Sequence, residues 1–464
     1  MPALRVALSL SALSLLLGAC ATGIIGPDFV APAAPDVASY TAEPLPARTA
    51  SANAAGAEAQ TFQVGANVPD RWWTLFRSDT LNRLVDEALA ANPSLAAAQS
   101  TLIAAQENQA ATNRALLPSV NLPNVQAGAS NDNPFTVVAG DLTVTYAVDV
   151  CCGAARTRES HEAQLARQVA ALQASYLTLT ANVVNAVIDL ALLQERLNAT
   201  RAVLGLQREL LAISEQRLAL GDIAGADVAQ QQSQVVNSEA QLVSLERQVA
   251  QQTNQLGLYL GRYPSEMERV SIDLNDLRLP TDIPVSLPSQ LVAQRPDIVQ
   301  ATYSLHAATA NVGASIANLL PQVSISGSFT PAGLAWNVAA SIAQAAINGG
   351  ANLRRTAAAE ASLDAAASTY EATVLAAFVD VADSLNAITY DARLMALQVE
   401  AESASRRSLD LTRQQYELGT AAYSEVLSAE QSHRSAVTEL LSSRADRLRD
   451  TVALYVALGG GWNG

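Results

Sequence analysis

Apolar residues recur at alternating intervals of four and three along the chain. One such stretch runs from Leu165 to Leu218, for more than seven heptads, and a sustained repeat of 3.5 residues is typical of a left-handed coiled coil. A continuous helix over about 155–220 would measure roughly 100 Å at 1.5 Å per residue. Gly221 to Ala226 interrupt the pattern, and a similar spacing returns from Val228 to Leu256. The stretch therefore predicts a long helical hairpin.

A second pattern has a period of two. Between Leu142 and Val150, apolar residues alternate with Thr143, Thr145 and Asp149, which predicts a strand with one apolar face. The stretch from Val120 to about Ala129 can supply its partner. Two further stretches behave in the same way, 323–329 and 334–342, and Pro331-Ala332-Gly333 between them favours a turn. We therefore expect two β-hairpins.

The whole arrangement occurs twice. Asn92-Pro93 aligns with Arg295-Pro296, and the alignment continues without a gap, at an offset of 203, to two Leu-Leu-Pro sequences that end the predicted helices. Leu220-Gly221 aligns with Leu418-Gly419 at an offset of 198. Asn92 is expected to cap a helix starting at Pro93, and Pro296-Asp297 to start its counterpart. A period near 200 residues indicates one duplicated unit and makes a short-repeat solenoid improbable.

We predict the following organisation, with a helix, a β-hairpin and a long helical hairpin in each repeat. The boundaries are a first repeat at 71–265 with its β-hairpin at about 119–152 and helical hairpin at about 155–260, a linker at 266–288, and a second repeat at 289–464 with its hairpins at about 322–348 and 352–458.

The N-terminus predicts export and lipid attachment. Arg5 precedes an apolar stretch too short to span a bilayer, so 1–19 is expected to be a signal peptide. It ends in Leu-Gly-Ala-Cys, which resembles a bacterial lipobox and would make Cys20 the lipidated mature N-terminus. Several acyl chains anchor a protein stably, whereas one does not. The alternative is a plain signal peptide with an incidental cysteine. Residues 20–70, rich in Ala, Pro, Ser and Thr, are expected to be an extended tether.

Composition excludes several function classes. Acidic residues outnumber basic ones 43 to 28, for a net charge of −15, which disfavours nucleic-acid binding. All 28 basic residues are arginine, so no lysine can serve as nucleophile, base or P-loop residue. His161, His306 and His433 stand far apart, outside any zinc-binding spacing, and no GxSxG sequence occurs. We expect no metal, no cofactor other than the lipid, and no enzyme activity.

The strands predict an assembly. About ten residues tilted near 45° cross roughly 25 Å, the apolar height of an outer-membrane barrel. Four strands cannot close, and an open edge in lipid leaves backbone groups unpaired, so several chains must combine. Two chains would give a plugged barrel, and three would give twelve strands and room for a channel. A periplasmic coiled-coil rod without a barrel is the less favoured alternative.

Several motifs in order resemble the TolC-like outer membrane factors, in particular the NodT-type lipoproteins of resistance-nodulation-division (RND) efflux pumps. The matching pieces are Gly26 to Pro32, Arg71-Trp72-Trp73 with Phe76, Asp79, Leu81, Ala88-Leu89 and Asn92, Gln216 to Gly221 with Asp227-Val228, Arg295 to Ile298, and Asn348-Gly349-Gly350. The resemblance implies a homotrimer in the outer membrane. Its fold would be mixed α/β: a 12-stranded β-barrel, four strands per chain, continued by a long periplasmic α-helical coiled-coil barrel.

The function expected from this resemblance is passive conduction. Substrates expelled by an inner-membrane RND pump would pass a periplasmic adaptor, enter the trimer and leave through the barrel. A channel for type I protein secretion or metal efflux is the alternative within transport. A non-transporting structural lipoprotein of the envelope is a further one.

Two sets of residues are candidate functional sites. By resemblance, the turns between the long helices would dock the adaptor, through Arg217, Leu218, Gly221, Asp222, Leu418, Gly419 and Thr420. Asp227 and Glu425 are equivalent under the 198 offset, so a trimer would place six acids near its periplasmic aperture and favour cations. A structural alternative makes Asp227 a helix cap with Gln230 at its third position, and Ser424 a cap with Glu425 in the first turn.

The sequence departs from the family at two places. Ser428 stands where relatives often carry an acid in the second turn, so gate contacts made by that acid cannot be carried over. Cys151-Cys152 replace the usual residues after the second strand, and adjacent cysteines do not make a useful disulfide framework.

Overall fold

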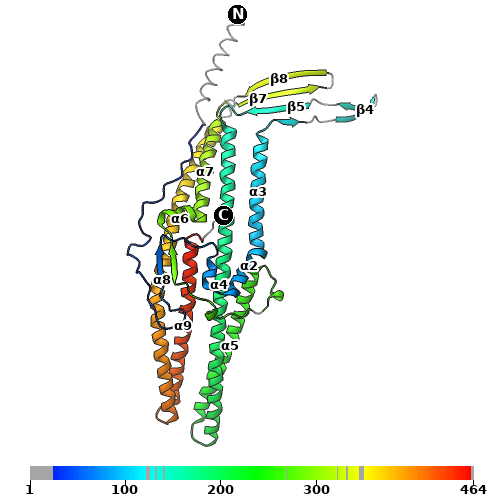
Figure 1. The fold of residues 1–464 in the computed structure, drawn as a ribbon. Coiled ribbons are helices and arrows are strands. Elements are labelled where there is room, and N and C mark those ends of the chain that lie inside the picture. The colour runs from blue at the N-terminus through cyan, green and yellow to red at the C-terminus, as the bar shows by residue number, and fades with distance from the viewer. Residues whose placement is uncertain are drawn as a thin grey trace. The chain divides into compact units, whose positions relative to one another are not determined.

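A computed structural model describes residues 25–121, 126–130, 133–138, 142–268, 270–320, 322–330, 333–343 and 350–460. The chain forms two compact units, each built from three separate stretches. The first contains residues up to 33, 98–172 and 296–374, and the second contains 34–97, 173–295 and 375–464. Figure 1 follows the order of the elements along the chain. Cys20, the turn residues Pro331 and Ala332, and Asn348-Gly349 lie outside the described residues.

The first unit contains the strands β2–β5, β7 and β8. A four-stranded antiparallel sheet has the order β2-β5-β7-β8, and β3 pairs separately with β4. The strand bounds are β2 Ser119–Asn121, β3 Gln126–Ser130, β4 Asn133–Val138, β5 Leu142–Val148, β7 Gln322–Thr330 and β8 Gly333–Ala343.

The sheet carries an exposed apolar face. Val120 pairs with Val144, and Tyr146 pairs with Ile325, so the four side chains share one side of the sheet. All four are exposed in the single chain. The alternation in the sequence therefore turns apolar residues outward, as a lipid-facing sheet requires.

Helices accompany this sheet. The first unit contains α7 (Pro296–Ala317), most of α3 (Pro93–Ala115) and the first parts of α4 (Gly153–Ala219) and α8 (Ala351–Glu417). α7 begins at Pro296, as expected. The expected cap of α3 is also present, because the Asn92 Oδ1 accepts hydrogen bonds from the amides of Ser94 at 2.9 Å and Leu95 at 3.2 Å. The duplicated helix starts thus rest on the proline and cap residues that the sequence displays.

Cys151-Cys152, where the sequence departs from the family, lie in the connection between β5 and α4. Cys152 adopts a left-handed backbone with φ of 57°, which is uncommon outside glycine. The Asp149 carboxylate accepts a hydrogen bond from the Ala155 amide at 2.9 Å, in the first turn of α4. An acidic cap therefore starts this helix.

The second unit contains the remainder of the long helices. It is built around the remaining parts of α4 and α8, together with α5 (Gly225–Leu260) and α9 (Tyr423–Ala457), the return helices of the two hairpins. The heptad positions from Leu179 to Ser214 are mostly buried, including polar Thr200, Gln207 and Ser214. The Ser214 hydroxyl donates to the Gln231 Oε1 of α5 at 2.7 Å. Coiled-coil packing within the hairpin accounts for the period of 3.5.

Short elements complete the second unit. The bounds are β1 Thr61–Val64, the 3-10 helix η1 Trp72–Phe76, α2 Asp79–Ala91, the 3-10 helices η2 Pro264–Glu266 and η3 Leu274–Asp276, β6 Asp282–Val285 and α6 Pro288–Gln294. Trp72, Trp73 and Phe76 are fully buried, and the Trp72 ring lies 5.8 Å from that of Tyr455 in α9. The paired tryptophans of the family-like motif thus form a core.

Arg295, from the family-like Arg-Pro-Asp-Ile motif, ties helices together within this unit. Its guanidinium donates to the Asp380 carboxylate at 2.5 Å and to the carbonyls of Ala377 and Ala457. The residue therefore joins α8 to the end of α9, in addition to preceding the start of α7.

The expected tether at 20–70 is more ordered than we predicted. Residues Thr61–Val64 form β1, which pairs in parallel with β6. The residues just before β1 are held by α9. The Gly56 carbonyl, the Glu58 carbonyl and the Gln60 Oε1 accept hydrogen bonds from the buried Arg447 guanidinium, at 2.6, 3.0 and 2.9 Å. The prediction failed because a segment without periodic apolar residues can still be held through its backbone groups, which leave no pattern in the sequence.

Candidate functional site

The two turns between the long helices have the same backbone structure. In the first, the amide of Asp222 donates to the Arg217 carbonyl and that of Gly221 to the Leu218 carbonyl, both at 2.9 Å. In the second, Thr420 donates to Gln415 at 2.9 Å and Gly419 to Tyr416 at 3.0 Å. This is the glycine-dependent Schellman ending of a helix, and the glycines have φ of 79° and 74°. Gly221 and Gly419 therefore fix the shape of both turns.

The residue before each of these glycines is an exposed leucine. Leu220 is 80% exposed and Leu418 is 78% exposed in the single chain. Leu218, which we predicted for docking, is 39% exposed. Sequence reasoning missed Leu220, although the 198 offset that pairs it with Leu418 was visible. The apolar surface that both turns present is thus contributed by the pair Leu220 and Leu418.

Arg217 faces the other hairpin. Its guanidinium donates to the Tyr416 hydroxyl at 3.1 Å and lies over the same ring, 5.6 Å from the centroid. Asp222 is 3.9 Å away, at the limit of an ion pair, and the Tyr416 ring in turn packs against Tyr423 of α9 at 5.7 Å. Burial raises the pKa of the Tyr423 hydroxyl, so Tyr423 stays neutral at ordinary pH. A cation and two tyrosines therefore connect the two turns of one chain.

The candidate acids lie in the first turns of the return helices. α5 is preceded by the cap residue Ala224 and α9 by Ala422, so Asp227 and Glu425 each occupy the third helical position. The alternative in which Asp227 and Ser424 are the caps is therefore wrong. The Glu425 carboxylate accepts from the Ala422 amide at 3.3 Å. Acids at the positive end of a helix stabilise it, so Asp227 and Glu425 favour the starts of the two return helices.

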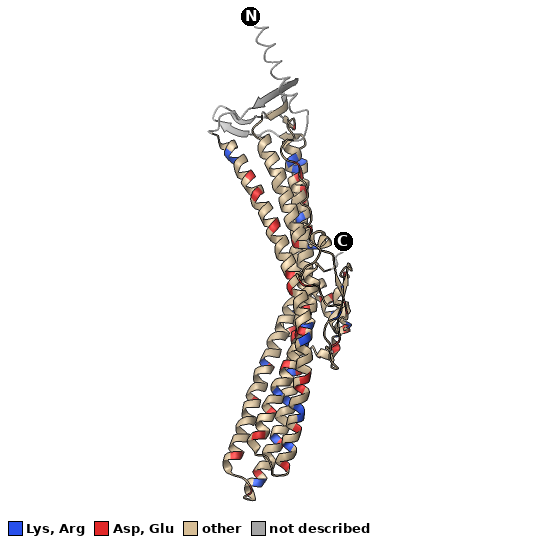
Figure 2. Ribbon diagram, turned by 90° about the vertical axis from the view of Figure 1, so that its left-hand side faces the viewer, with Lys and Arg blue, Asp and Glu red and all other residues tan. Residues whose placement is uncertain are grey.

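Ion pairs join the two helices of each hairpin. Arg201 pairs with Glu246 at 3.0 Å and Arg208 with Glu239 at 2.6 Å in the first hairpin, and Arg413 pairs with Glu430 at 2.8 Å in the second. Figure 2 shows charged residues distributed along these helices. Such pairs add little stability where they are exposed, but they fix which helix faces align.

The segment that follows the predicted lipidation site is docked within the first unit. Asp28 pairs with Arg156 at 2.6 Å, and Arg156 also donates to the Ile25 carbonyl at 3.0 Å. Phe29 stacks on the His306 ring, with centroids 4.2 Å apart. The family-like Gly-Pro-Asp-Phe sequence therefore packs against α4 and α7, a role that sequence reasoning did not assign.

A carboxylate completes this docking site. Glu159 lies 2.7 Å from Arg156 and 2.9 Å from the His306 Nε2. Burial raises the pKa of Glu159, but the hydrogen bonds from Arg156 and His306 outweigh it and leave that pKa lowered. His306 is thus a structural residue of this docking site, held between Glu159 and Phe29. Among the described residues, no group of three histidine, cysteine or acidic side chains could hold a metal ion.

Comparisons with known proteins agree with this architecture. A family model described as outer membrane efflux protein matches residues 84–262 and 287–460. The pyoverdine export outer membrane protein OpmQ of Pseudomonas putida KT2440 is 29% identical over 443 residues, covering 90% of this chain and 94% of that protein. The probable outer membrane lipoprotein SilC of Salmonella typhimurium is 28% identical, covering 84% of this chain and 88% of its own length.

A solved structure gives the same result for the fold. The outer-membrane channel OprN superposes with a TM-score of 0.81 at 27% identity, over 94% of this chain and 99% of that one. The family model matches the chain in two separate stretches, which agrees with a duplicated unit. The chain therefore belongs to the outer membrane efflux protein family, and it is an outer-membrane exit channel of an efflux system, not an enzyme.

Proposed function

We propose that three copies of this efflux channel form one duct whose paired turns bind a periplasmic adaptor through Leu220 and Leu418. The observation that carries the proposal is the repetition of one Schellman turn, each presenting an exposed leucine before the glycine. A turn needs no leucine there, and large apolar side chains exposed in pairs favour a protein contact. An inner-membrane RND pump would deliver substrate through that adaptor.

Exposed apolar surface along α8 supports the trimer. Tyr390, Leu397 and Leu411 are separated by multiples of seven and are all exposed in the single chain. The most apolar stretch of α8 is 33% buried in the single chain, whereas that of α4 is 61% buried. A heptad-spaced apolar stripe packs against another helix, and neighbouring copies of the chain would supply that helix.

The sheet requires the same assembly. Its outer strands are β2 and β8, and lipid would leave their free backbone groups unpaired. Pairing β2 of one copy with β8 of the next would close a ring, and three sheets of four strands would give twelve. This number leaves room for a conducting lumen.

Two finer assignments belong to the same proposal. Lipid on Cys20 would anchor the mature chain in the outer membrane, and the similarity to SilC, a protein named as a lipoprotein, supports this. Asp227 and Glu425 would form the acidic ring at the periplasmic aperture and favour cations. The lipid anchor and the acidic ring are both supported by the sequence at these positions and by the resemblance to the family.

The docking assignment is tested with charged substitutions at the leucines. Leu220→Glu with Leu418→Glu should preserve trimers and surface location but abolish adaptor crosslinking and export of a pump substrate. The control, Leu220→Met with Leu418→Met, keeps an apolar side chain at both places and should export normally. Export at the unsubstituted rate by the glutamate variant would overturn the assignment.

Substitution of the glycines gives a second, independent arm. Gly221→Glu adds a charge in open space but also strains a backbone with φ of 79°. Gly221→Ala carries the same strain without the charge. Loss of adaptor crosslinking in the first variant and its retention in the second would assign the effect to the surface of the turn; equal loss in both would assign it to the backbone.

A further inference from the structure

The N-terminal segment at residues 25–29 contacts two helices that belong to different repeats. Arg156 and Glu159 lie on α4, in the first repeat, and His306 and Gly313 lie on α7, in the second. β5 leads into α4, α7 leads into β7, and β5 pairs with β7 in the sheet. The segment therefore bridges the helices that continue the two strands at which the repeats meet.

Two glycines allow the backbone of the segment to reach α7. A Cβ on Gly313 would lie 2.8 Å from the Ile25 carbonyl oxygen, and a Cβ on Gly26 would lie 2.5 Å from the Gly313 Cα. Gly26 also has a φ of 89°, which favours glycine. The missing side chains at these two positions thus form a notch on α7 that fits this segment closely.

Arg156 makes most of its hydrogen bonds to the segment. The residue is 2% exposed. Its guanidinium donates to the Ile25 carbonyl at 3.0 Å, to the Gly26 carbonyl at 3.4 Å and to the Asp28 carboxylate at 2.6 Å. The fourth acceptor, the Glu159 carboxylate, belongs to α4 itself. Undocking of the segment would therefore remove three of the four acceptors of this guanidinium, and hydrogen bonds to a charged group are the strong ones.

Phe29 connects the segment to the second repeat. Its ring stacks on that of His306, with an interplanar angle of 11°. The His306 Nε2 lies 2.9 Å from the Glu159 Oε1, and Glu159 also accepts from Arg156. Val30, the next residue of the chain, is 80% exposed. One continuous set of contacts thus runs from α4 through the segment to α7, and it ends at Phe29.

We propose that residues 25–29 are a clasp that joins the two repeats and holds β5 against β7. Because the notch needs residues of both α4 and α7, the clasp can close only when both repeats have folded. An opened strand pair in lipid would leave backbone groups unpaired, so a restraint on this pair protects the sheet. The contacts involve neither the turns nor Cys20, and the proposal therefore does not depend on the adaptor or on the lipid.

The test is amide hydrogen exchange of the full-length protein in nanodiscs, followed by mass spectrometry. Asp28→Ala with Phe29→Ala should speed exchange in β5 and β7 at least about tenfold, because one hydrogen bond to a charged group changes an opening equilibrium by about that factor. Exchange in α5, which belongs to the second unit, should not change. The matched control is Val30→Ala with Asp36→Ala, two exposed residues of the same stretch of chain, and it should leave the sheet unchanged.

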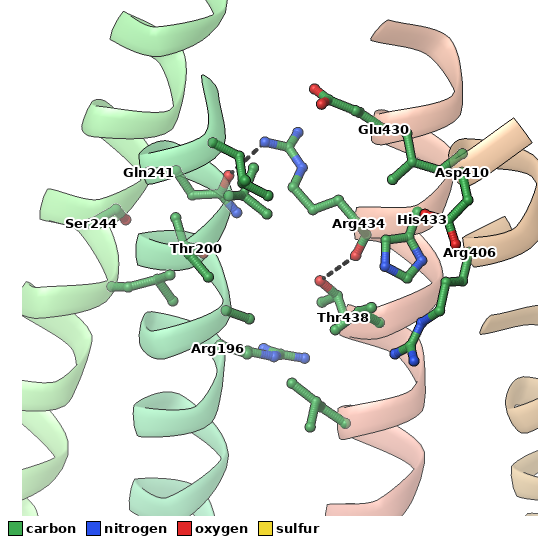
Figure 3. Close-up of a pocket in the computed structure, with 18 of the residues that line it drawn as sticks. Arg196, Thr200, Gln241, Ser244, Arg406, Asp410, Glu430, His433, Arg434 and Thr438 are labelled. Carbon is green, nitrogen blue, oxygen red and sulfur yellow. Dashed lines mark hydrogen bonds between the residues drawn. The ribbon is translucent and has the colours of Figure 1, made fainter. Parts of the chain in front are cut away.

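Substitution of Gly313 separates the clasp from ordinary helix stability. Alanine is favoured over glycine inside a helix, so Gly313→Ala would slow exchange if the notch had no role. We expect faster exchange in β5 and β7, because the new Cβ displaces the Ile25 carbonyl. The control is Gly205→Ala, in the part of α4 that borders the cavity between the two helical hairpins (Figure 3). No atom lies within 4 Å of a Cβ built there, so this variant should not affect the sheet.

Combined variants show whether the notch and the segment act together. When Asp28→Ala and Phe29→Ala have already released the segment, Gly313→Ala should change exchange by less than about twofold. A full additional effect would show that Gly313 acts only through helix packing, and this would overturn the clasp. Unchanged exchange of β5 and β7 in the double-alanine variant would overturn it as well. A Cys20→Ser background should give the same ratios, and loss of the effect there would mean that the segment acts only through the lipid.

Discussion

The contact between Arg217 and Tyr416 is expected to hold the two turns of each chain together. Arg217→Gln removes both the 3.1 Å hydrogen bond and the cation–π contact at 5.6 Å. A net hydrogen bond to a charged group contributes about 1.5–3 kcal/mol and an exposed cation–π contact about 0.5–1 kcal/mol. Arg217 is 37% exposed at its side chain, so solvent screening reduces the sum to roughly 1–2 kcal/mol per chain.

That loss corresponds to about a five- to thirtyfold shift toward separated turns in each chain. Tyr416→Phe keeps the ring and removes only the hydroxyl, so we expect roughly a fivefold shift from it. The double variant should give less than the sum of the two single effects, because both remove the same hydrogen bond. The assay is single-channel recording in planar bilayers, with the fraction of time spent in the high-conductance state as the measured quantity.

The matched control is Arg208→Gln. Arg208 pairs with Glu239 at 2.6 Å, and both residues belong to the first hairpin, so its loss should not change the open fraction. If Arg217→Gln and Arg208→Gln gave the same open fraction as the unsubstituted channel, Arg217 would not restrain the turns. A purely additive double variant would refute the direct bond while leaving a role for each residue alone.

Three further predictions follow from the anchor, the acids and a buried carboxyl pair. Cys20→Ser should abolish acyl labelling and cleavage at this site; unchanged lipid attachment would exclude the lipobox. Asp227→Asn with Glu425→Gln should reduce cation preference, measured as the reversal potential in a salt gradient; an unchanged potential would refute the ring. Burial and then the neighbouring Asp391 raise the pKa of Asp450 to about 8. The folded state therefore keeps a proton that the unfolded chain loses near pH 4, and stability falls as pH rises across that window. Asp450→Asn should raise the apparent melting temperature more at pH 8.5 than at pH 5; an equal rise at both would show that Asp450 is ionised in the fold.

Regular elements were predictable because their signals are periodic or local. The heptads of α4 and the alternation of β5 follow directly from which side chains must share a face. Asn92 and Pro296 indicate helix starts, because a side-chain cap and a first-turn proline act within a single helical turn. The duplication shows each element twice in the sequence. It also pairs Leu220 with Leu418, so a docking role predicted for Leu418 extends to Leu220.

The order of residues 56–64 and the docking of the segment at Phe29 depend on partners that are distant in sequence. Arg447 binds backbone carbonyls nearly four hundred residues away, and no pattern around Gly56 reveals that its carbonyl is an acceptor. The stacking of Phe29 on His306 is of the same kind. The cap at Asp227 was misassigned for a more local reason: a preferred capping residue lay three positions inside the helix, and Ala224 supplied the start without a side-chain bond.

The absence of lysine explains why long-range contacts in this chain are so specific. Every cationic contact must be made by a guanidinium, which is planar and presents up to five donors in fixed directions. Arg447 satisfies three acceptors at once and Arg217 combines a hydrogen bond with a stacked ring. A lysine at either place would offer a point charge without that geometry, so Arg217→Lys should keep the ion pair with Asp222 but lose the planar stacking of a guanidinium on the Tyr416 ring.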